Sequence, residues 1–309
     1  MPDERPVLTL AHSPDPDDAF MWRGLGHVGE RGSMTPSRDP EIDTGRFRFR
    51  VVAHDIETLN RRAVERGDLD CTAMSFHVYP HVKARYALTT CGASMGEGYG
   101  PKVVARDARP HEWLRTPGLR IATPGTRTTA HLTLRLLLGQ EFVARETPFE
   151  AIIDAVGQGD ADAGIVIHEG QLTYPDAGLQ LVVDLGAWWT DRTGLPLPLG
   201  ANAIRRDLDD RFGPGSAAAV AGVLKRSIEH AMANRASHLE HAAGFGRGIS
   251  PERNDEFVRM YVNDLTLDVG QRGREAVRRL LTEAHEQGLA PDPAPITWVG
   301  PGAAAGAGA

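Results

Sequence analysis

The sequence predicts an α/β fold that is divided into two lobes with a cleft between them. Short apolar runs alternate with segments of helical periodicity, which is typical of folds with largely parallel strands. The chain has 309 residues, and a single hydrophobic core stops growing near ~250–300 residues. A self-contained block of strands and helices separates the first third of the chain from the last, so these two outer parts are expected to pack together.

The first third of the chain is expected to alternate strands with helices. Asp55 occupies the position of a helix N-cap, because it ends one apolar run and precedes a helical pattern. Residues 29–46 are rich in Gly, Ser, Pro and charged residues and are expected to form a surface excursion. The predicted strands are 7–11, 47–55 and 68–75, and the predicted helices are 15–25, 56–67 and 76–86.

The middle of the chain repeats the alternation, and the last third is helical. The predicted strands are 100–106, 119–125, 161–169, 179–186 and 197–206, and the predicted helices are 128–139, 148–159, 216–232, 251–265 and 273–288. We assign residues 1–106 and 207–290 to a larger, discontinuous lobe 1, residues 107–206 to a smaller lobe 2, and residues 291–309 to a tail whose Ala/Gly-rich end is expected to be disordered. Two crossings then join the lobes, and a ligand is expected in the cleft between them.

The composition narrows the classes of protein. With 41% hydrophobic and 24% charged residues the chain is globular, and its net charge of −7 and lack of Lys/Arg runs argue against a nucleic-acid partner. No apolar stretch approaches the ~18 residues of a membrane span, and the first residues lack the pattern of a secretory signal. The two cysteines, Cys71 and Cys91, have no metal-site or disulfide-rich spacing, which suits a cytoplasmic location. The sequence does not decide whether a disulfide bond joins these two cysteines.

Metal and nucleotide sites are not expected. His77 and His81 have the i, i+4 spacing of zinc ligands, but Pro80 disturbs their helix and no Glu follows the first His. The aspartates at positions 15, 17 and 18 are better explained as residues of a turn and of a helix start than as cation ligands. The glycine-rich segment at 92–101 does not have the spacing of a phosphate-binding loop, and its glycines are better explained by a flexible crossing or by tight turns.

Two strand-to-helix junctions and one strand end are candidates for a binding site. Ser75 ends one predicted strand just before a helix, and Thr128, Thr129 and Ala130 open the helix that follows another strand. Free backbone N–H groups at a helix start bind carboxylates or phosphates, although each of these hydroxyl groups could simply cap its own helix.

His168 is a candidate general base, because it lies at the carboxyl end of a predicted strand and an imidazole titrates near neutrality. It could equally be a hydrogen-bonded histidine at a strand end. Glu169 could orient it, although neighbours on a strand point to opposite faces. Trp188 and Trp189 are either core residues or a surface on which an aromatic substrate stacks.

Several segments closely resemble the 1,4-dihydroxy-6-naphthoate synthases of the futalosine route to menaquinone. The likeness runs in order from about residue 7 to about residue 290 and is most specific over 165–207. The segments are SPDPDDAF (13–20), DIETLNRRA (55–63), TPGTRTTA (123–130), GIVIHEGQLTYPDAGLQLVVDLGAWW (164–189) and RTGLPLPLGANAIRRDL (192–208). The resemblance implies a fold of the periplasmic-binding-protein type II class, used as a cytoplasmic lyase. Such an enzyme releases 1,4-dihydroxy-6-naphthoate from cyclic dehypoxanthine futalosine without metal or redox cofactor.

The resemblance also implies roles for six residues. The family's proton-accepting histidine falls on His168, its substrate-binding segment on Ala73, Met74 and Ser75, and its Thr-Ala pair on Thr129 and Ala130. The resemblance implies that the binding partner of the protein is its substrate, a small molecule that carries a carboxylate group.

The chain departs from the family pattern at two positions. Asp17 stands where the family often has Asn, and Ala73 where it often has Lys. Chorismate dehydratase of the same pathway and a non-catalytic solute-binding protein are the alternative functions. The oligomeric state is left open.

Overall fold

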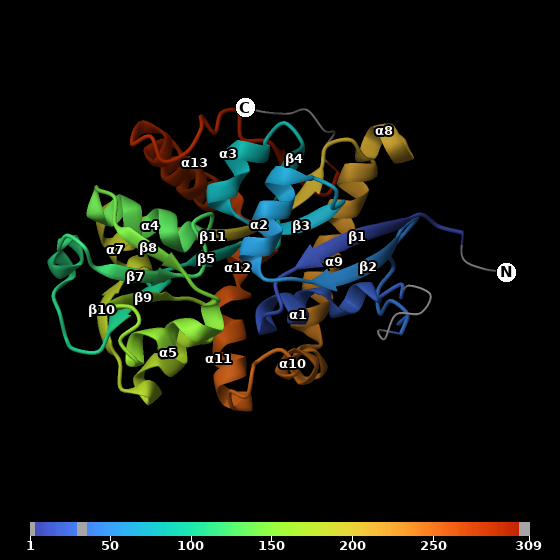
Figure 1. Cartoon of the computed structure of the whole chain (residues 1–309). Helices are drawn as coiled ribbons and strands as arrows, with labels where there is room; N and C mark the ends of the chain where they lie inside the picture. Colours follow the sequence, from blue (N-terminus) through green and yellow to red (C-terminus); the bar gives the residue numbers. More distant parts are fainter. Residues whose placement is uncertain (1–3, 30–35, 303–309) are drawn as a thin grey trace.

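The computed structural model describes residues 4–29 and 36–302, which form two mixed β-sheets with helices packed around them (Figure 1). The larger sheet has the order β12-β4-β11-β3-β1-β2, with β5 paired to β11, and the smaller sheet has the order β10-β6-β9-β7-β8. The larger sheet consists of β1 (Val7–His12), β2 (Arg48–Ala53), β3 (Cys71–Ser75), β4 (Tyr86–Thr89), β5 (Ser94–Gly96), β11 (Leu197–Arg205) and β12 (Trp298–Val299). The smaller sheet consists of β6 (Lys102–Ala105), β7 (Arg120–Thr123), β8 (Val143–Glu146), β9 (Ala163–Val166) and β10 (Gln180–Asp184). The predicted α/β fold is confirmed.

The helices also divide into two groups, one packed around each sheet. The larger sheet is accompanied by α1 (Pro16–Trp22), α2 (Ile56–Glu65), α3 (Tyr79–Val82), α8 (Leu208–Phe212), α9 (Ser216–Ala233), α10 (Arg235–Ala243), α11 (Pro251–Tyr261), α12 (Asp264–Leu267) and α13 (Gly270–Glu286). The smaller sheet is accompanied by α4 (Thr129–Leu138), α5 (Ile152–Gly157), α6 (Gly170–Thr173) and α7 (Leu185–Thr193), with α4 and α5 on opposite faces (Figure 1). Short 3-10 turns complete the chain at Arg23–Leu25, Phe76–Val78, His111–Arg115, Phe149–Ala151 and Tyr174–Ala177. Within the described residues, no helix is both long and apolar enough to cross a membrane.

Both sheets are mixed. The expectation of largely parallel strands is wrong for two strands, β6 and β11. β1 pairs in parallel with β2 and β3, and β7 pairs in parallel with β8 and β9. In contrast, β11 is antiparallel to β3, β4 and β5, and β6 is antiparallel to β9 and β10. The chain enters β6 and β11 directly after crossing from one sheet to the other. Their directions are therefore set by the crossings and not by βαβ connections.

The strands change sheet several residues away from the expected lobe boundaries at 106 and 206. β6 belongs to the smaller sheet although it lies before residue 106, and β11 belongs to the larger sheet although it lies before residue 206. We therefore propose that the lobes meet at 97–101 and at 194–196. The predicted tail is also partly structured, because β12 pairs in parallel with β4 in the larger sheet. Its final residues, 303–309, lie outside the described part of the chain.

The first crossing packs directly against the smaller lobe. A Cβ atom on Gly96 would lie 1.8 Å from the carbonyl oxygen of Tyr99, and a Cβ atom on Gly186 would lie 1.9 Å from the same oxygen. Glycine is therefore required at both positions by close backbone approach. The glycine-rich segment that contains Gly96 forms the connection between β5 and β6.

A hydrophobic cluster fixes the start of α4 beside the cleft. Leu132, Leu134 and Leu136 of this helix are at most 5% exposed and belong to a cluster with Trp189 of α7 and Leu280 of α13. The helix begins at an N-cap, Thr128, whose side chain accepts a hydrogen bond from the amide of His131. Since the cluster contains residues of both lobes, it holds this helix start against the larger sheet.

Candidate active site

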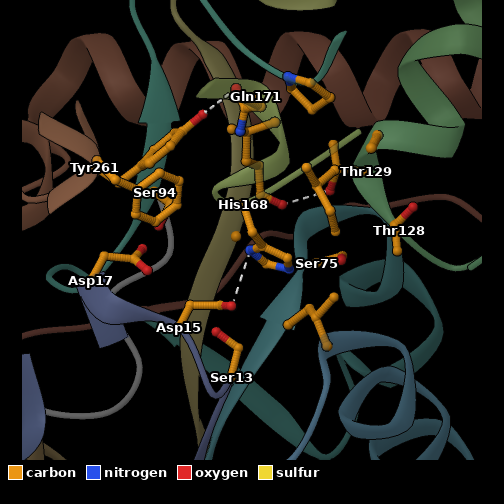
Figure 2. A pocket seen from close by; sticks show the side chains of 17 residues that line it. Ser13, Asp15, Asp17, Ser75, Ser94, Thr128, Thr129, His168, Gln171 and Tyr261 are labelled. Atoms are coloured by element: carbon orange, nitrogen blue, oxygen red, sulfur yellow. Dashed lines mark hydrogen bonds and ion pairs between the residues drawn. The ribbon is translucent and has the colours of Figure 1, made fainter. Parts of the chain in front are cut away.

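A pocket opens between the two sheets, where strand ends and helix starts of both lobes meet (Figure 2). It has an empty volume of about 630 Å³, which includes its opening to solvent. The larger lobe contributes Ser13, Asp15, Asp17, Ile56, Ser75, Ser94, Leu199, Gly200, Phe257 and Tyr261 to its lining, and the crossing and smaller lobe contribute Pro101, Thr128, Thr129, Ala130, Ile167, His168 and Gln171. Four of the six predicted site residues, His168, Ser75, Thr129 and Ala130, therefore meet in one pocket.

His168 lies just after β9 in a strained backbone conformation. Its φ of 53° is in the left-handed region, which is uncommon for all residues other than glycine, although Asn, Asp and His are enriched among the exceptions. The side chain is 16% exposed, and the edge of Phe149 packs against the imidazole with ring centroids 4.7 Å apart. The chain therefore turns out of the buried strand so that the imidazole enters the pocket.

A charged cluster adjoins His168. Its Nδ1 atom lies 3.0 Å from Oδ2 of Asp15, and Figure 2 marks this contact with a dashed line. The Nη1 atom of Arg247 lies 3.1 Å from Oδ1 of Asp15 and 2.9 Å from a carboxylate oxygen of Glu169. Asp15 and Arg247 belong to the larger lobe, whereas His168 and Glu169 follow β9 of the smaller one. This cluster, which we call the interlobe clasp, joins the two lobes beside the pocket.

The two predicted strand-to-helix junctions differ in detail. At the second junction, the Thr128 side chain caps α4, which is the alternative role considered for these hydroxyl groups. Thr129 instead donates a hydrogen bond to the carbonyl of Leu199 at 2.7 Å. The amides of Thr129 and Ala130 belong to the first helical turn, which has no carbonyl partners within its own helix. Ser75 stands at the start of a short helical segment, in which the 3-10 turn Phe76–Val78 continues into α3. Its side chain makes no capping bond, so the capping alternative is wrong at Ser75, and the side chain lines the pocket.

Ser75 is held in place by Asn60. Its backbone amide donates to Oδ1 of Asn60 at 2.9 Å, and its hydroxyl accepts from Nδ2 of Asn60 at 3.0 Å. Since the hydroxyl accepts this bond, its own proton remains available for a ligand.

Several other predicted residues do not line the pocket. Ala73 and Met74 are buried in two hydrophobic clusters of the larger lobe. Trp189 is fully buried and Trp188 packs beside it under Arg192, so the tryptophans stabilise the smaller lobe. Glu169 contacts Arg247, and it is Asp15 that contacts His168.

Most of the remaining lining residues were not predicted, and three of them form a contact across the pocket: Phe257, Tyr261 and Gln171. Phe257 and Tyr261 are neighbours on one face of α11, and their i, i+4 spacing is also that of an apolar core stripe. The Tyr261 hydroxyl donates to Oε1 of Gln171 at 2.9 Å, which joins the two lobes across the pocket. Burial raises the pKa of Tyr261, so that its hydroxyl stays protonated and keeps this bond.

Asp17 is a buried carboxyl group in the pocket wall. Burial, and then the charges of Asp18 and Asp15, raise its pKa well above the ordinary value. Its Oδ1 atom has no hydrogen-bond partner among the described residues, whereas Asp18 accepts from the Ser13 amide and hydroxyl. Asp17 therefore keeps its proton to higher pH than an ordinary aspartate.

We expect Asp17→Asn to stabilise the protein at high pH. The carboxyl contributes its stability below the pKa of the unfolded chain, near 3.8, and this contribution is lost as the pH rises through the raised folded-state pKa. Asn has similar shape and no such loss. The Tm of the variant should exceed that of the parent by about 2–4 °C at pH 8, the size of shift produced by ~1 kcal/mol, and the difference should vanish near pH 4. Equal Tm values at both pH values would contradict the buried, proton-retaining state of Asp17.

The residues weighed as metal ligands do not form a site in the pocket. Burial lowers the pKa of both His77 and His81, and no carboxylate or cysteine joins them in a ligand cluster within residues 4–29 and 36–302. In the same ranges one cluster with suitable spacing occurs, away from the pocket, and it consists of Glu41, His230 and His238. Arg23 already binds the Glu41 carboxylate there. Cys71 and Cys91 are both buried free thiols, which settles the open question of a bridge.

A comparison with protein families gives a match over most of the chain. A family model described as menaquinone biosynthesis matches residues 8–286. The 1,4-dihydroxy-6-naphtoate synthase of Thermus thermophilus is 43% identical over 295 residues, which cover 94% of this chain and 98% of that protein. The 1,4-dihydroxy-6-naphtoate synthase of Streptomyces coelicolor is 36% identical over 292 residues, which cover 92% of this chain and 95% of that protein.

Solved structures agree on the architecture. Protein AF1704 from Archaeoglobus fulgidus has a TM-score of 0.79 and 39% identity and covers 92% of this chain and 98% of its own. The alkanesulfonate-binding protein SsuA from Xanthomonas axonopodis pv. citri has a TM-score of 0.66 at 14% identity and covers 95% of this chain and 98% of its own. The second likeness shows the fold alone, and it is that of periplasmic binding proteins, as the sequence predicts.

Proposed function

The chain belongs to the menaquinone biosynthesis family, and from this membership we propose that it is a carbon–carbon lyase that converts cyclic dehypoxanthine futalosine to 1,4-dihydroxy-6-naphthoate. The two named relatives support an enzyme of this kind. One observation in the molecule carries the proposal: a single histidine, His168, enters a pocket between the lobes in a strained conformation. Backbone strain is concentrated at functional sites, where surrounding contacts maintain it.

His168 is proposed as the general base. In its neutral form it removes a proton adjacent to a carbonyl group on the bicyclic part of the substrate. Loss of that proton gives an enolate. When the carbon–carbon bond to the sugar-derived fragment then breaks, its bonding pair passes to the ring system beside the carbonyl group, the fragment leaves as a carbonyl compound on losing its hydroxyl proton, and aromatisation of the remaining rings makes the step favourable. General-base catalysis contributes ~10²–10⁴-fold, so that orientation of the substrate within the pocket must supply much of the remaining acceleration.

The substrate carboxylate is proposed to bind at the start of α4. The amides of Thr129 and Ala130 and the positive end of the helix dipole are suited to an anion. The free proton of the Ser75 hydroxyl offers a further donor beside this helix start. Phe257 and Tyr261 provide apolar ring surface for the aromatic part of the substrate.

Thr129→Val tests whether the amide or the hydroxyl of Thr129 binds the ligand. The hydroxyl already donates to Leu199 and accepts a bond from the His77 amide at 3.3 Å. We therefore expect the variant to bind naphthoate product within threefold of the parent but to lose ~1 kcal/mol of stability, as measured by fluorescence titration and urea unfolding. Thr129→Ser keeps the hydroxyl and should match the parent in both. A tenfold loss of affinity for Thr129→Val alone would instead assign the hydroxyl to the ligand.

The proposed function is tested with two substrates and one protein. The purified chain is incubated with cyclic dehypoxanthine futalosine and, separately, with chorismate, and the products are separated by liquid chromatography. We expect 1,4-dihydroxy-6-naphthoate from the first substrate and no change in the second. Dehydration of chorismate would support the sister enzyme of the pathway, and tight binding of either compound without turnover would support a solute-binding protein.

We also propose a cytoplasmic location. The two buried cysteines are unpaired, which suits a reducing compartment.

A further inference from the structure

We infer that Asp15 is the positioning residue of His168 and that the base is therefore assembled from both lobes. The inference rests on the proposed role of His168 as the base. Oδ2 of Asp15 lies 3.0 Å from Nδ1 of His168. Asp15 lies between β1 and α1 of the larger lobe, whereas His168 follows β9 of the smaller lobe. Neither lobe carries both members of the pair.

A purely structural role does not explain Asp15. It occupies the N-cap position of α1, yet its side chain makes no capping hydrogen bond. The side chain is only 1% exposed, and a buried carboxylate is costly unless it is paired. Arg247 pairs with Oδ1, whereas Oδ2 has no hydrogen-bond partner of its own among the described residues, and His168 Nδ1 is the charged-group contact that it makes, at 3.0 Å. One oxygen of Asp15 is thus left for the imidazole.

This contact selects one tautomer of the imidazole. A carboxylate accepts hydrogen bonds and does not donate them, so that Nδ1 of His168 carries the ring proton. In the neutral ring the lone pair is then on Nε2. Figure 2 shows that this nitrogen is on the side of the pocket where Ser75 lies. The proton-accepting atom is therefore exposed to the ligand, and the carboxylate stabilises the imidazolium that forms when the proton is taken.

Backbone strain points to the same three residues. Among residues 4–29 and 36–302, His168 and Arg247 are the only non-glycine residues with positive φ, at 53° and 48°. Both contact Asp15, from opposite sides of its carboxylate. Because such conformations cost free energy, their pairing around one buried aspartate indicates that the fold is built to hold that carboxylate against the imidazole.

The test compares Asp15→Asn with Asp15→Ala. The amide of Asn has the shape of the carboxylate but can donate to Nδ1, which moves the ring proton to Nε2 and blocks the base. Ala leaves the ring free to populate both tautomers. We expect kcat to fall about 10²–10³-fold in Asp15→Asn and about 10-fold in Asp15→Ala, by analogy with the loss that a wrong tautomer causes in other enzymes. If Asp15 acted only through packing, kcat would fall more in Asp15→Ala than in Asp15→Asn, because the Asn side chain has nearly the shape of the Asp side chain.

Glu169→Gln is the matched control. It removes one negative charge from the same interlobe clasp and one partner of Arg247, but Glu169 does not contact the imidazole. Its kcat at saturating substrate should stay within threefold of the parent. A similar loss in Glu169→Gln and Asp15→Asn would overturn the inference, since the charge of the cluster, and not the contact with His168, would then be responsible.

The parent protein provides a measurement that needs no change at Asp15. Long-range nitrogen–proton NMR spectra of the ¹⁵N-labelled protein, with His168 assigned from the His168→Asn variant, should show the proton on Nδ1. A proton on Nε2 would overturn the inference even if the Asp15 variants failed to fold.

The outcomes also separate this inference from the proposed function. If Asp15→Asn keeps kcat within threefold of the parent while His168→Asn is inactive, the positioning role is wrong and the lyase assignment stands. If the parent does not convert cyclic dehypoxanthine futalosine, the lyase assignment fails, and the tautomer measurement still decides whether Asp15 orients the ring.

Discussion

Replacing His168 with Asn is expected to reduce kcat about 10²–10⁴-fold, the contribution of a general base, while the affinity for naphthoate product changes less than threefold. Asn is a better choice than Ala at this position, because His168 has a φ of 53° and Asn adopts the left-handed region more readily than most residues. Steady-state turnover of cyclic dehypoxanthine futalosine and a product titration measure the two effects.

His168→Gln serves as a second variant that is closer in length to the imidazole. Thermal unfolding should show a moderate loss of stability in both variants, because the imidazole packs on Phe149 and contacts the buried Asp15. The loss should be larger in His168→Gln, since Gln adopts a φ of 53° less readily than Asn. Turnover within a few-fold of the parent in both variants would remove His168 from the catalytic role, whatever the product affinity.

Replacing Arg247 with Met is expected to be the most destabilising of the changes considered. The guanidinium contacts the carboxylates of Asp15 and Glu169, whose side chains are 1% and 11% exposed. Without it, two buried negative charges lose their common cation. Breaking a fully buried pair costs ~3–5 kcal/mol, and because Arg247 is itself 28% exposed, we expect about 2–3 kcal/mol. Urea unfolding measures this, and KM should rise because the lobes lose a link beside the pocket.

A double variant checks the electrostatic origin of that loss. Adding Glu169→Gln to Arg247→Met removes one of the unpaired charges, so that the double variant should be more stable than Arg247→Met alone. A coupling free energy of at least ~1 kcal/mol is expected for residues in direct contact. Strictly additive losses would mean that the alkyl part of Arg247, which lies over the Phe149 ring, provides the stability by packing.

Within the described residues, sequence patterns located β1, β2, β3, β6, β7, β9, β10 and β11. β4 was missed although it is fully buried, because it has only four residues and its first residue ends the predicted helix 76–86. β5 and β12 have only three and two residues, and β8 is a mostly exposed edge strand with the sequence VARE. The direction of β6 and β11 depends on tertiary crossings, which no local pattern encodes.

The part of the site that depends on one strand end or one helix start was predictable. His168 follows a buried strand, and the Thr128–Ala130 junction begins a helix with an N-cap, both of which are local patterns. The interlobe clasp was not predictable, because Asp15, Glu169 and Arg247 are far apart in sequence. Asp15 in particular precedes a proline at a helix start, where aspartate ordinarily serves as a cap.

The contact of Gly96 and Gly186 with the carbonyl of Tyr99 limits how the two lobes move relative to one another. No side chain lies between the first crossing and the start of α7, so the two backbones pack directly against each other. We expect any rotation of the lobes to be centred on this contact, because a displacement along it is limited by backbone atoms. Such a fixed centre would bring His168 of one lobe back to the same position opposite Asp15 of the other.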